Sequence, residues 1–356
     1  MGCAGSKDEG LGGGKIKDRY RTFQQVQEAL RKNGLESSNL IIAIDYTASN
    51  TMQGMKTFGK PNLHDQGNPP NPYKQAISAL AQTLSPFDED QLIPVYGFGD
   101  ARTHDNAVFH FNPGGRMCHG LEEILTRYSQ LTPQLKFAGP TSFAPAVYEA
   151  MKIVQQSGNQ YHILVILCDG GITGSGITGG ARWSPQEEET IQAIIDASHV
   201  PLSIVAVGVG DGPWDQMEHL DDKIRNRQFD NFQFVDFVRV LKKSGGAGTT
   251  EGLAGFAAHA LMEVPQQFRI CTSLGYVGRP GPSHVPPKWA SRMPLMPPDD
   301  ATGGGGAPAF QAMPSANNYG GGPPPNMFQA VPSFNHAPAG GYPPAAGGGY
   351  PTVQKF

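Results

Sequence analysis

The stretch Leu40-Ile41-Ile42-Ala43-Ile44-Asp45-Tyr46-Thr47-Ala48-Ser49 decides the fold class of this chain. Its continuous apolar run predicts a strand that is buried on both faces, and the acidic and hydroxyl side chains that follow predict a functional turn. Similar apolar runs alternate with helical patterns along the chain. The predicted strands are residues 40–45, 92–98, 162–169, 202–208 and 232–235, and the predicted helices are residues 22–33, 72–83, 120–129, 143–156, 185–197 and 252–263. We therefore expect an α/β fold of the Rossmann-like kind, with a mainly parallel sheet and helices on both faces.

Oxygen-bearing side chains occupy three of the predicted turns. The first turn carries Asp45, Thr47 and Ser49, the second carries Thr141, and the third carries Asp169. In parallel α/β folds ligands bind beyond the carboxyl ends of the strands, and carboxylate and hydroxyl oxygens suit a hard divalent cation. One such turn alone is common, because Ser and Thr near a helix start are usually caps. Three turns in these positions favour a site for Mg²⁺ or Mn²⁺, with Ca²⁺ as an open alternative.

These turns resemble the metal-ion-dependent adhesion site of the von Willebrand factor A domain, and the chain around them resembles the copine-type form of that domain. The resemblance covers roughly residues 19–270, and we place the copine-type domain at residues 19–290. The motifs that carry it include Ala43-Ile44-Asp45-Tyr46-Thr47-Ala48-Ser49-Asn50, Tyr96-Gly97-Phe98-Gly99-Asp100, Gly139-Pro140-Thr141-Ser142-Phe143-Ala144-Pro145 and Val207-Gly208-Val209-Gly210-Asp211-Gly212-Pro213-Trp214-Asp215.

The resemblance implies a protein-binding module in which the five oxygen ligands named above hold a metal with an open coordination position. An acidic residue of a protein partner would fill that position. Tyr46 and Asn50 lie on the same turn as the first ligands, so we regard both as candidate partner contacts.

The N-terminus reads Met1-Gly2-Cys3-Ala4-Gly5-Ser6-Lys7, which fits the pattern for N-myristoylation at Gly2. One myristoyl chain binds membranes only marginally, with a constant of about 10⁴ M⁻¹, so stable anchoring needs a second signal. Palmitoylation of Cys3 would supply it. We expect residues 1–18 to form an acylated flexible segment that holds the protein at the cytoplasmic face of the plasma membrane, alongside a cytosolic pool. A nuclear pool stays an open alternative.

Composition separates the C-terminal part of the chain from the rest. The 356 residues include 46 Gly and 31 Pro, and after residue 300 the only charged side chain is Lys355. A segment this poor in aliphatic residues cannot bury enough apolar surface to fold. We therefore expect residues 291–356 to be a disordered Gly/Pro/Tyr-rich tail.

Charge and cysteine usage exclude several other classes of protein. The formal net charge is −4 at pH 7, which gives the chain no electrostatic reason to bind nucleic acid. The four cysteines are far apart, which argues against a disulfide framework or a cysteine-built zinc site and suits a reducing cytosolic compartment. No apolar stretch approaches the ~20 residues that cross a bilayer.

Within the copines the chain is most similar to plant RING domain ubiquitin ligases, which pair a myristoylated N-terminus and a copine-type domain with a C-terminal RING. A RING binds zinc through Cys and His ligands in paired spacing, which the scattered cysteines do not supply. We therefore expect a non-enzymatic, metal-dependent adaptor in signalling. The alternative is a role in ubiquitination, as a substrate recruiter or as a partner of a RING-containing ligase or a conjugating enzyme.

Two enzyme classes fit the sequence less well. Asp45 at a strand end resembles the nucleophile of aspartate-dependent phosphatases, but the second acid those enzymes need is replaced here by Thr47. The run Gly208-Val209-Gly210-Asp211-Gly212 resembles a dinucleotide-binding loop, but its third glycine comes one residue early and Pro213 follows. We therefore expect no catalytic residue.

Overall fold

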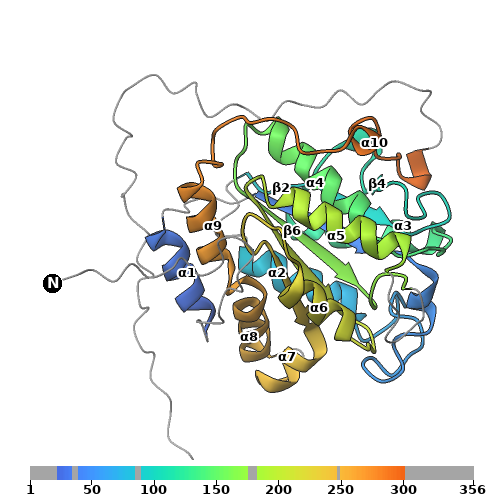
Figure 1. Ribbon diagram of the computed structural model, residues 1–356. Helices are drawn as coiled ribbons and strands as arrows, with labels where there is room; N and C mark the ends of the chain where they lie inside the picture. Colours follow the sequence, from blue (N-terminus) through green and yellow to red (C-terminus); the bar gives the residue numbers. More distant parts are fainter. Residues whose placement is uncertain (1–21, 34–38, 85–89, 175–182, 247–248, 301–356) are drawn as a thin grey trace, which may run out of the picture. The chain divides into compact units, whose positions relative to one another are not determined.

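The computed structural model describes residues 22–33, 39–84, 90–174, 183–246 and 249–300 (Figure 1). Within them, a six-stranded sheet lies at the centre. In spatial order its strands are β4 (Phe109–His110), β3 (Val95–Phe98), β1 (Asn39–Asp45), β6 (His162–Cys168), β7 (Leu202–Gly208) and β8 (Phe232–Asp236). All neighbouring pairs are parallel except β3 with β4, which is antiparallel. The prediction of an α/β fold with a mainly parallel sheet is confirmed.

Helices cover both faces of the sheet. They are α1 (Phe23–Lys32), α2 (Pro72–Leu84), α3 (Gly120–Leu131), α4 (Ala144–Gln156), α5 (Pro185–Ala197), α6 (Asp215–Lys223), α7 (Phe237–Lys243), α8 (Thr250–Leu261), α9 (Val264–Ser273) and α10 (Pro287–Ala290), with short 3₁₀ turns η1 (Ala48–Thr51), η3 (Pro113–Gly115), η4 (Thr132–Gln134) and η5 (Pro298–Asp300). Alternate residues of β1 enter two separate cores. Ile42 and Ile44 pack with α2, α3, α7, α8 and α9, whereas Ile41 and Ala43 pack with α4, α5 and α6. A strand with two buried faces has no polar alternation, which is why its sequence reads as one apolar run.

The predicted strand at residues 92–98 is wrong in one respect, because the structure divides it into two. β2 (Leu92–Ile93) pairs with β5 (Cys118–His119) in a separate two-stranded sheet, and only β3 joins the main sheet. Pro94 lies at the division. It has no N–H to donate, and its carbonyl oxygen accepts the N–H of Ile42 at 3.0 Å.

The first helix begins with a capping box formed by Thr22 and Gln25. Thr22 Oγ1 accepts the N–H of Gln25 and Gln25 Oε1 accepts the N–H of Thr22, both at 3.3 Å. Val26 is fully buried, and α1 packs against α8 and α9. This helix is therefore part of the folded domain.

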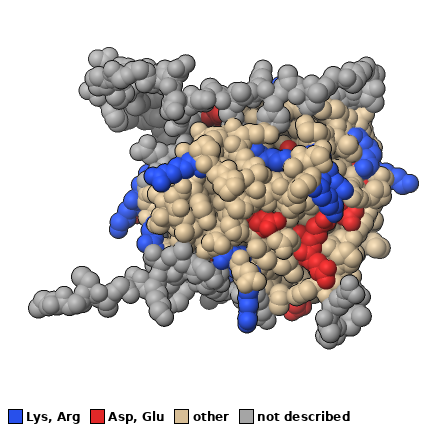
Figure 2. Space-filling view, turned by 45° about the horizontal axis from the view of Figure 1, so that its top comes forward, with Lys and Arg blue, Asp and Glu red and all other residues tan. Residues whose placement is uncertain are grey.

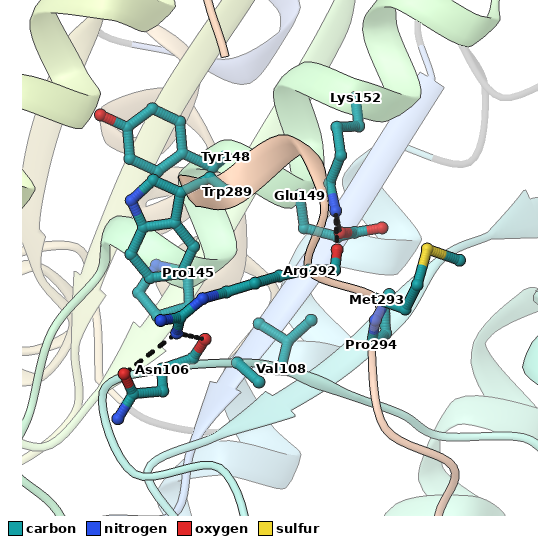
Figure 3. Close-up of a pocket in the computed structure, with 11 residues that line it drawn as sticks. Asn106, Val108, Pro145, Tyr148, Glu149, Lys152, Trp289, Arg292, Met293 and Pro294 are labelled. Atoms are coloured by element: carbon teal, nitrogen blue, oxygen red, sulfur yellow. Dashed lines mark hydrogen bonds and ion pairs between the residues drawn. The ribbon is translucent and has the colours of Figure 1, made fainter. Parts of the chain in front are cut away.

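Residues 278–299, which include α10 and most of η5, run across the domain, and we call this segment the C-terminal strap (Figure 1, orange). In its middle, the indole of Trp289 stacks on Tyr148 of α4 with ring centroids 5.3 Å apart, and the guanidinium of Arg292 lies 4.7 Å from the indole centroid (Figure 3). Arg292 also donates to Asn106, and its carbonyl oxygen accepts from Lys152 Nζ at 2.7 Å. The strap is thus held by packing as well as by hydrogen bonds.

The end of the strap extends the main sheet beyond its edge strand β4. The N–H of Leu295 donates to Val108 O at 2.8 Å, and the N–H of His110 donates to Leu295 O at 2.9 Å. Asp299 then forms an ion pair with Arg127 of α3 at 2.8 Å. The predicted start of the tail at residue 291 is therefore wrong, because residues 291–299 pack on the domain. The remaining predicted tail, from residue 301, lies outside the described residues.

One face of the molecule carries charged side chains of both signs (Figure 2). The face drawn in Figure 2 carries separate basic side chains around a group of acidic ones, with large uncharged areas between them. Among the described residues, no helix has the length and apolar character that a membrane span requires.

Candidate metal centre

The first predicted turn folds back on the carboxylate at the end of β1. Asp45 is fully buried, and its Oδ1 accepts the N–H of Thr47 at 2.7 Å. The hydroxyl oxygens of Thr47 and Ser49 lie 3.0 Å apart as η1 begins. This turn therefore gathers a carboxylate and two hydroxyls at the carboxyl end of a central strand.

The second carboxylate comes from the neighbouring strand. β1 and β6 are paired in parallel with Ile44 opposite Leu167, so the residues that follow emerge at the same edge of the sheet. There Asp45 and Asp169 lie close enough that the negative charge of Asp169 raises the pKa of Asp45, and the nearby Ser49 hydroxyl acts to lower that of Asp169. Asp169 is only 1% exposed. The sheet register thus brings together the two acids that the sequence places 124 positions apart, 169 minus 45.

Hydrogen bonds join Thr141 to Thr173, in the segment that follows Asp169. The N–H of Thr141 donates to Thr173 Oγ1 at 2.8 Å, and its carbonyl oxygen accepts the N–H of Thr173 at 3.0 Å. Thr141 is 5% exposed. The second predicted turn is therefore bonded directly to the third.

Burial and mutual repulsion make it costly for both carboxyl groups to ionise. Burial and then the negative charge of Asp169 raise the pKa of Asp45 well above its ordinary value. Burial raises the pKa of Asp169 from 3.8 to about 6. The pKa of the adjacent Cys168 thiol is also raised well above its usual value by burial, so this cysteine is a poor nucleophile.

The donor set fits a hard divalent cation. Asp45 Oδ2 and Asp169 Oδ2 are both buried without a hydrogen-bond donor, which leaves two inward-facing oxygens for a proton or a cation. No group of three or more His, Cys, Asp and Glu side chains that could hold a metal occurs among the described residues. The two carboxylates would therefore rely on hydroxyl oxygens from Thr47, Ser49 and Thr141 to complete a coordination sphere, as Mg²⁺ and Mn²⁺ permit.

A buried histidine that the sequence pattern did not predict, His64, contacts the backbone of the first turn. His64 Nε2 lies 2.8 Å from the carbonyl oxygen of Asp45, and His64 Nδ1 lies 2.7 Å from the Tyr128 hydroxyl. A carbonyl oxygen only accepts, so Nε2 carries the proton and Nδ1 accepts from Tyr128. Burial lowers the pKa of His64 to about 3, which keeps the ring neutral. The imidazole is also stacked between Tyr46 and Tyr73, at centroid distances of 4.7 and 4.1 Å.

The predicted partner contacts of Tyr46 and Asn50 are not supported, because both residues are fully buried. The Tyr46 hydroxyl lies 3.1 Å from Thr132 Oγ1. Asn50 accepts the Tyr73 hydroxyl at 2.7 Å and donates to Thr47 O at 3.2 Å. Both side chains brace the turn from the interior, which leaves them unavailable to a partner protein.

Two glycines allow the neighbouring strand ends to approach the site closely. A Cβ on Gly210 would lie 1.9 Å from the carbonyl oxygen of Asp169. Gly99 has a φ of +82°, and a Cβ there would lie 2.4 Å from the Thr47 methyl carbon. Both glycines lie in the motifs that carry the copine resemblance, but the close approaches they permit depend on contacts between distant segments. Gly2 and Cys3 lie outside the described residues.

The topology and the oxygen-lined strand ends define the class: this is a Rossmann-like domain of the von Willebrand factor A type. The copine family model matches residues 62–279, and the chain belongs to the copine family. It is 53% identical over 284 residues to E3 ubiquitin-protein ligase RGLG2 of Arabidopsis thaliana, an alignment covering 80% of this chain and 59% of that protein. It is 43% identical over 268 residues to Copine family protein 1 of Caenorhabditis elegans, which covers 75% of this chain and 22% of that protein. The chain thus spans about three fifths of the ligase it matches.

Solved structures give weaker likenesses. A von Willebrand factor type A protein from Catenulispora acidiphila aligns with a TM-score of 0.37 and 14% identity, over 65% of this chain and 43% of that one. Proximal thread matrix protein 1 from the mussel byssus, with a zinc-occupied MIDAS motif, aligns with a TM-score of 0.36 and 15% identity, over 63% and 46% of the two chains. Scores at this level identify neither a ligand nor a function.

Proposed function

We propose that this chain is a divalent-metal-dependent, protein-binding adaptor of the copine type that acts in signalling. The observation that carries the proposal is the pair of buried, donor-free oxygens on Asp45 and Asp169 beside the hydroxyls of Thr47 and Ser49. A Mg²⁺ or Mn²⁺ ion held by two carboxylates and neutral hydroxyls keeps affinity for a further anionic ligand. An Asp or Glu side chain of a protein partner would supply that ligand.

Calorimetric titration with Mn²⁺ tests the metal site. We expect Asp45→Ala and Asp169→Ala to abolish binding, because each removes one of the two carboxylates. Asp100→Asn is the matched control, since Asp100 is 1% exposed and its Oδ1 accepts the Thr103 N–H at 2.9 Å, outside the proposed ligand set. Unchanged Mn²⁺ affinity in either alanine variant would refute the assignment.

We also propose that acyl chains on Gly2 and Cys3 attach the protein to the cytoplasmic face of the plasma membrane. The supporting observation is the N-terminal sequence, which offers two lipid signals where one binds only marginally. Expressed in cells, Gly2→Ala should move from the membrane pellet to the soluble fraction, and Cys3→Ser should do so in part. Persistent pelleting of Gly2→Ala would count against this mode of attachment.

A role in ubiquitination is the second candidate function, and its support is the similarity to named E3 ubiquitin-protein ligases across 80% of this chain. In this alternative the chain recruits substrates or pairs with a RING-containing ligase or a conjugating enzyme. An autoubiquitination assay with purified protein separates the two candidates. Robust ubiquitin chains formed without an added ligase would contradict the adaptor proposal.

A further inference from the structure

Three exposed apolar side chains lie on the connections that follow β1 and β6, the strands that carry the two carboxylates. The described residues include five large apolar side chains with high exposure: Met52, Met55, Leu92, Trp183 and Met293. Met52 and Met55 follow β1, and Trp183 lies between β6 and α5, so all three come from connections that follow the strands bearing the carboxylates. Their exposed fractions are 72%, 58% and 42%. We call these three residues the apolar rim.

Short chains of hydrogen bonds tie the rim to the candidate ligands. The N–H of Met52 donates to Ser49 O at 2.9 Å. On the other side, Ser184, next to Trp183, donates its hydroxyl to Thr173 O at 2.6 Å, and Thr173 is bonded to Thr141 as described above. The rim therefore borders the site from two of its three turns.

The backbone that carries the rim is held in place by neighbouring elements. The carboxylate of Asp211, which follows β7, accepts the N–H groups of Lys56 and Thr57 at 3.0 and 2.8 Å. The Trp183 ring lies 5.2 Å from the ring of His219 in α6. Figure 1 shows the connection after β1 (blue) at the end of the sheet toward which the β6 arrow points. Because the backbone that carries the rim is already held in place, it loses little conformational freedom when a partner binds.

The chemistry of the rim points to one kind of occupant. Methionine and tryptophan are adaptable, apolar contact residues, and a concentration of them on a surface marks a protein-binding site. The same connection carries Lys56, whereas its second lysine, Lys60, forms an ion pair with Asp65. A partner segment that pairs an acid for the metal with large apolar side chains for the rim fits both parts of this surface, whereas a wholly polar acidic segment would leave the rim in water.

We propose that the apolar rim selects partner segments in which an Asp or Glu has a large apolar side chain, such as Leu, Phe or Met, close to it in sequence. The carboxylate would bind the metal, and the apolar neighbour would pack on Met52, Met55 and Trp183. The proposal rests on the proposed metal function and adds the property that would distinguish one acidic partner from another.

Selection from a random peptide library displayed on phage tests this proposal. The library is bound to the full chain in Mn²⁺ and eluted with EDTA, in parallel for wild type, for the rim variant Met52→Ser/Met55→Ser/Trp183→Ser, and for the control Leu92→Ser/Met293→Ser. We expect wild type and control to enrich peptides that combine an acid with a nearby large apolar residue. The rim variant should retain the acid but lose the apolar preference, and it should bind wild-type-selected peptides about tenfold more weakly or worse. Its calorimetric Mn²⁺ affinity should equal that of wild type.

The outcomes separate this inference from the function on which it rests. Acid-containing peptides without apolar enrichment on the wild type, or the same enrichment on the rim variant, would overturn the role of the rim and leave the metal function standing. EDTA-eluted peptides without any acid, or no EDTA-dependent binding, would overturn the metal function and the inference with it.

Discussion

Replacing Asp169 by Asn should make the metal-free protein more stable, although it removes the second carboxylate of the candidate site. In the fold, burial raises the pKa of this group from 3.8 to about 6. A carboxyl group with a higher pKa in the folded than in the unfolded state favours folding when protonated and opposes it when ionised. The contribution of this group to the free energy of unfolding therefore increases as the pH falls from 6 toward 3.8, and this contribution is lowest above pH 6.

The size of the effect follows from the same pKa shift. A rise of the pKa from 3.8 to about 6 corresponds to about 3 kcal/mol of destabilisation at neutral pH. Asparagine has nearly the same shape, carries no charge, and can donate from its amide to the donor-free Oδ2 of Asp45. For a domain of this size, about 3 kcal/mol raises the melting temperature by about 5–10 °C.

Thermal unfolding in EDTA at pH 7.5 and pH 5 measures the stability difference between Asp169→Asn and wild type. The gain in Asp169→Asn over wild type should fall to about half at pH 5, because the wild-type carboxyl is then largely protonated when folded. Saturating Mg²⁺, at about 100 times its dissociation constant, should stabilise wild type by about 2.7 kcal/mol and leave Asp169→Asn unchanged. A variant that is no more stable than wild type in EDTA, or that gains equally from Mg²⁺, would refute the reasoning.

Three further perturbations test the support of the site and the edge of the domain. His64→Ala should lower the free energy of unfolding in urea by about 3–5 kcal/mol, since it leaves a cavity and removes one hydrogen bond each from the Asp45 carbonyl and the Tyr128 hydroxyl; a loss below about 1 kcal/mol would contradict the supporting role. Gly210→Ala should cost about 1–3 kcal/mol and weaken Mg²⁺ stabilisation, because its Cβ meets the Asp169 carbonyl. Gly170→Ala is its matched control, with no atom within 4 Å of the new Cβ, and equal losses in both would argue against the close approach. Thr22→Ala should speed hydrogen exchange in α1 about fivefold by removing the cap, and unchanged exchange would contradict this.

The central strands, and the placement of Asp45 and Asp169 at one edge of the sheet, could be predicted from the sequence because each depends on local pattern plus one topological rule. β7 and α5 have the bounds expected from their apolar runs, and α5 begins at Ser184 with a capping box to Glu187. Asp45 and Asp169 are brought together because the carboxyl ends of neighbouring parallel strands emerge at one edge of the sheet. That step requires no knowledge of contacts between other distant segments.

The remaining features depend on contacts between distant segments, which no local pattern encodes. Tyr46 follows a strand that is buried on both faces, so its burial against Thr132 could not be read from alternation. His64 lies in a polar connection, and only the fold places it between two tyrosines under Asp45. Pro94 is a signal that was available, because a proline within a predicted strand indicates an edge or a break.

The C-terminal strap determines where a recombinant fragment of this domain can end without exposing an edge of the sheet. An uncovered edge strand offers unpaired N–H and C=O groups on which another chain can add. A fragment cut at residue 279, where the family match stops, would lose Trp289 and Leu295 and so expose Tyr148 and the outer edge of β4. Such a fragment should associate with itself through that edge, whereas a fragment that extends to residue 300 keeps its own cover and should stay monodisperse.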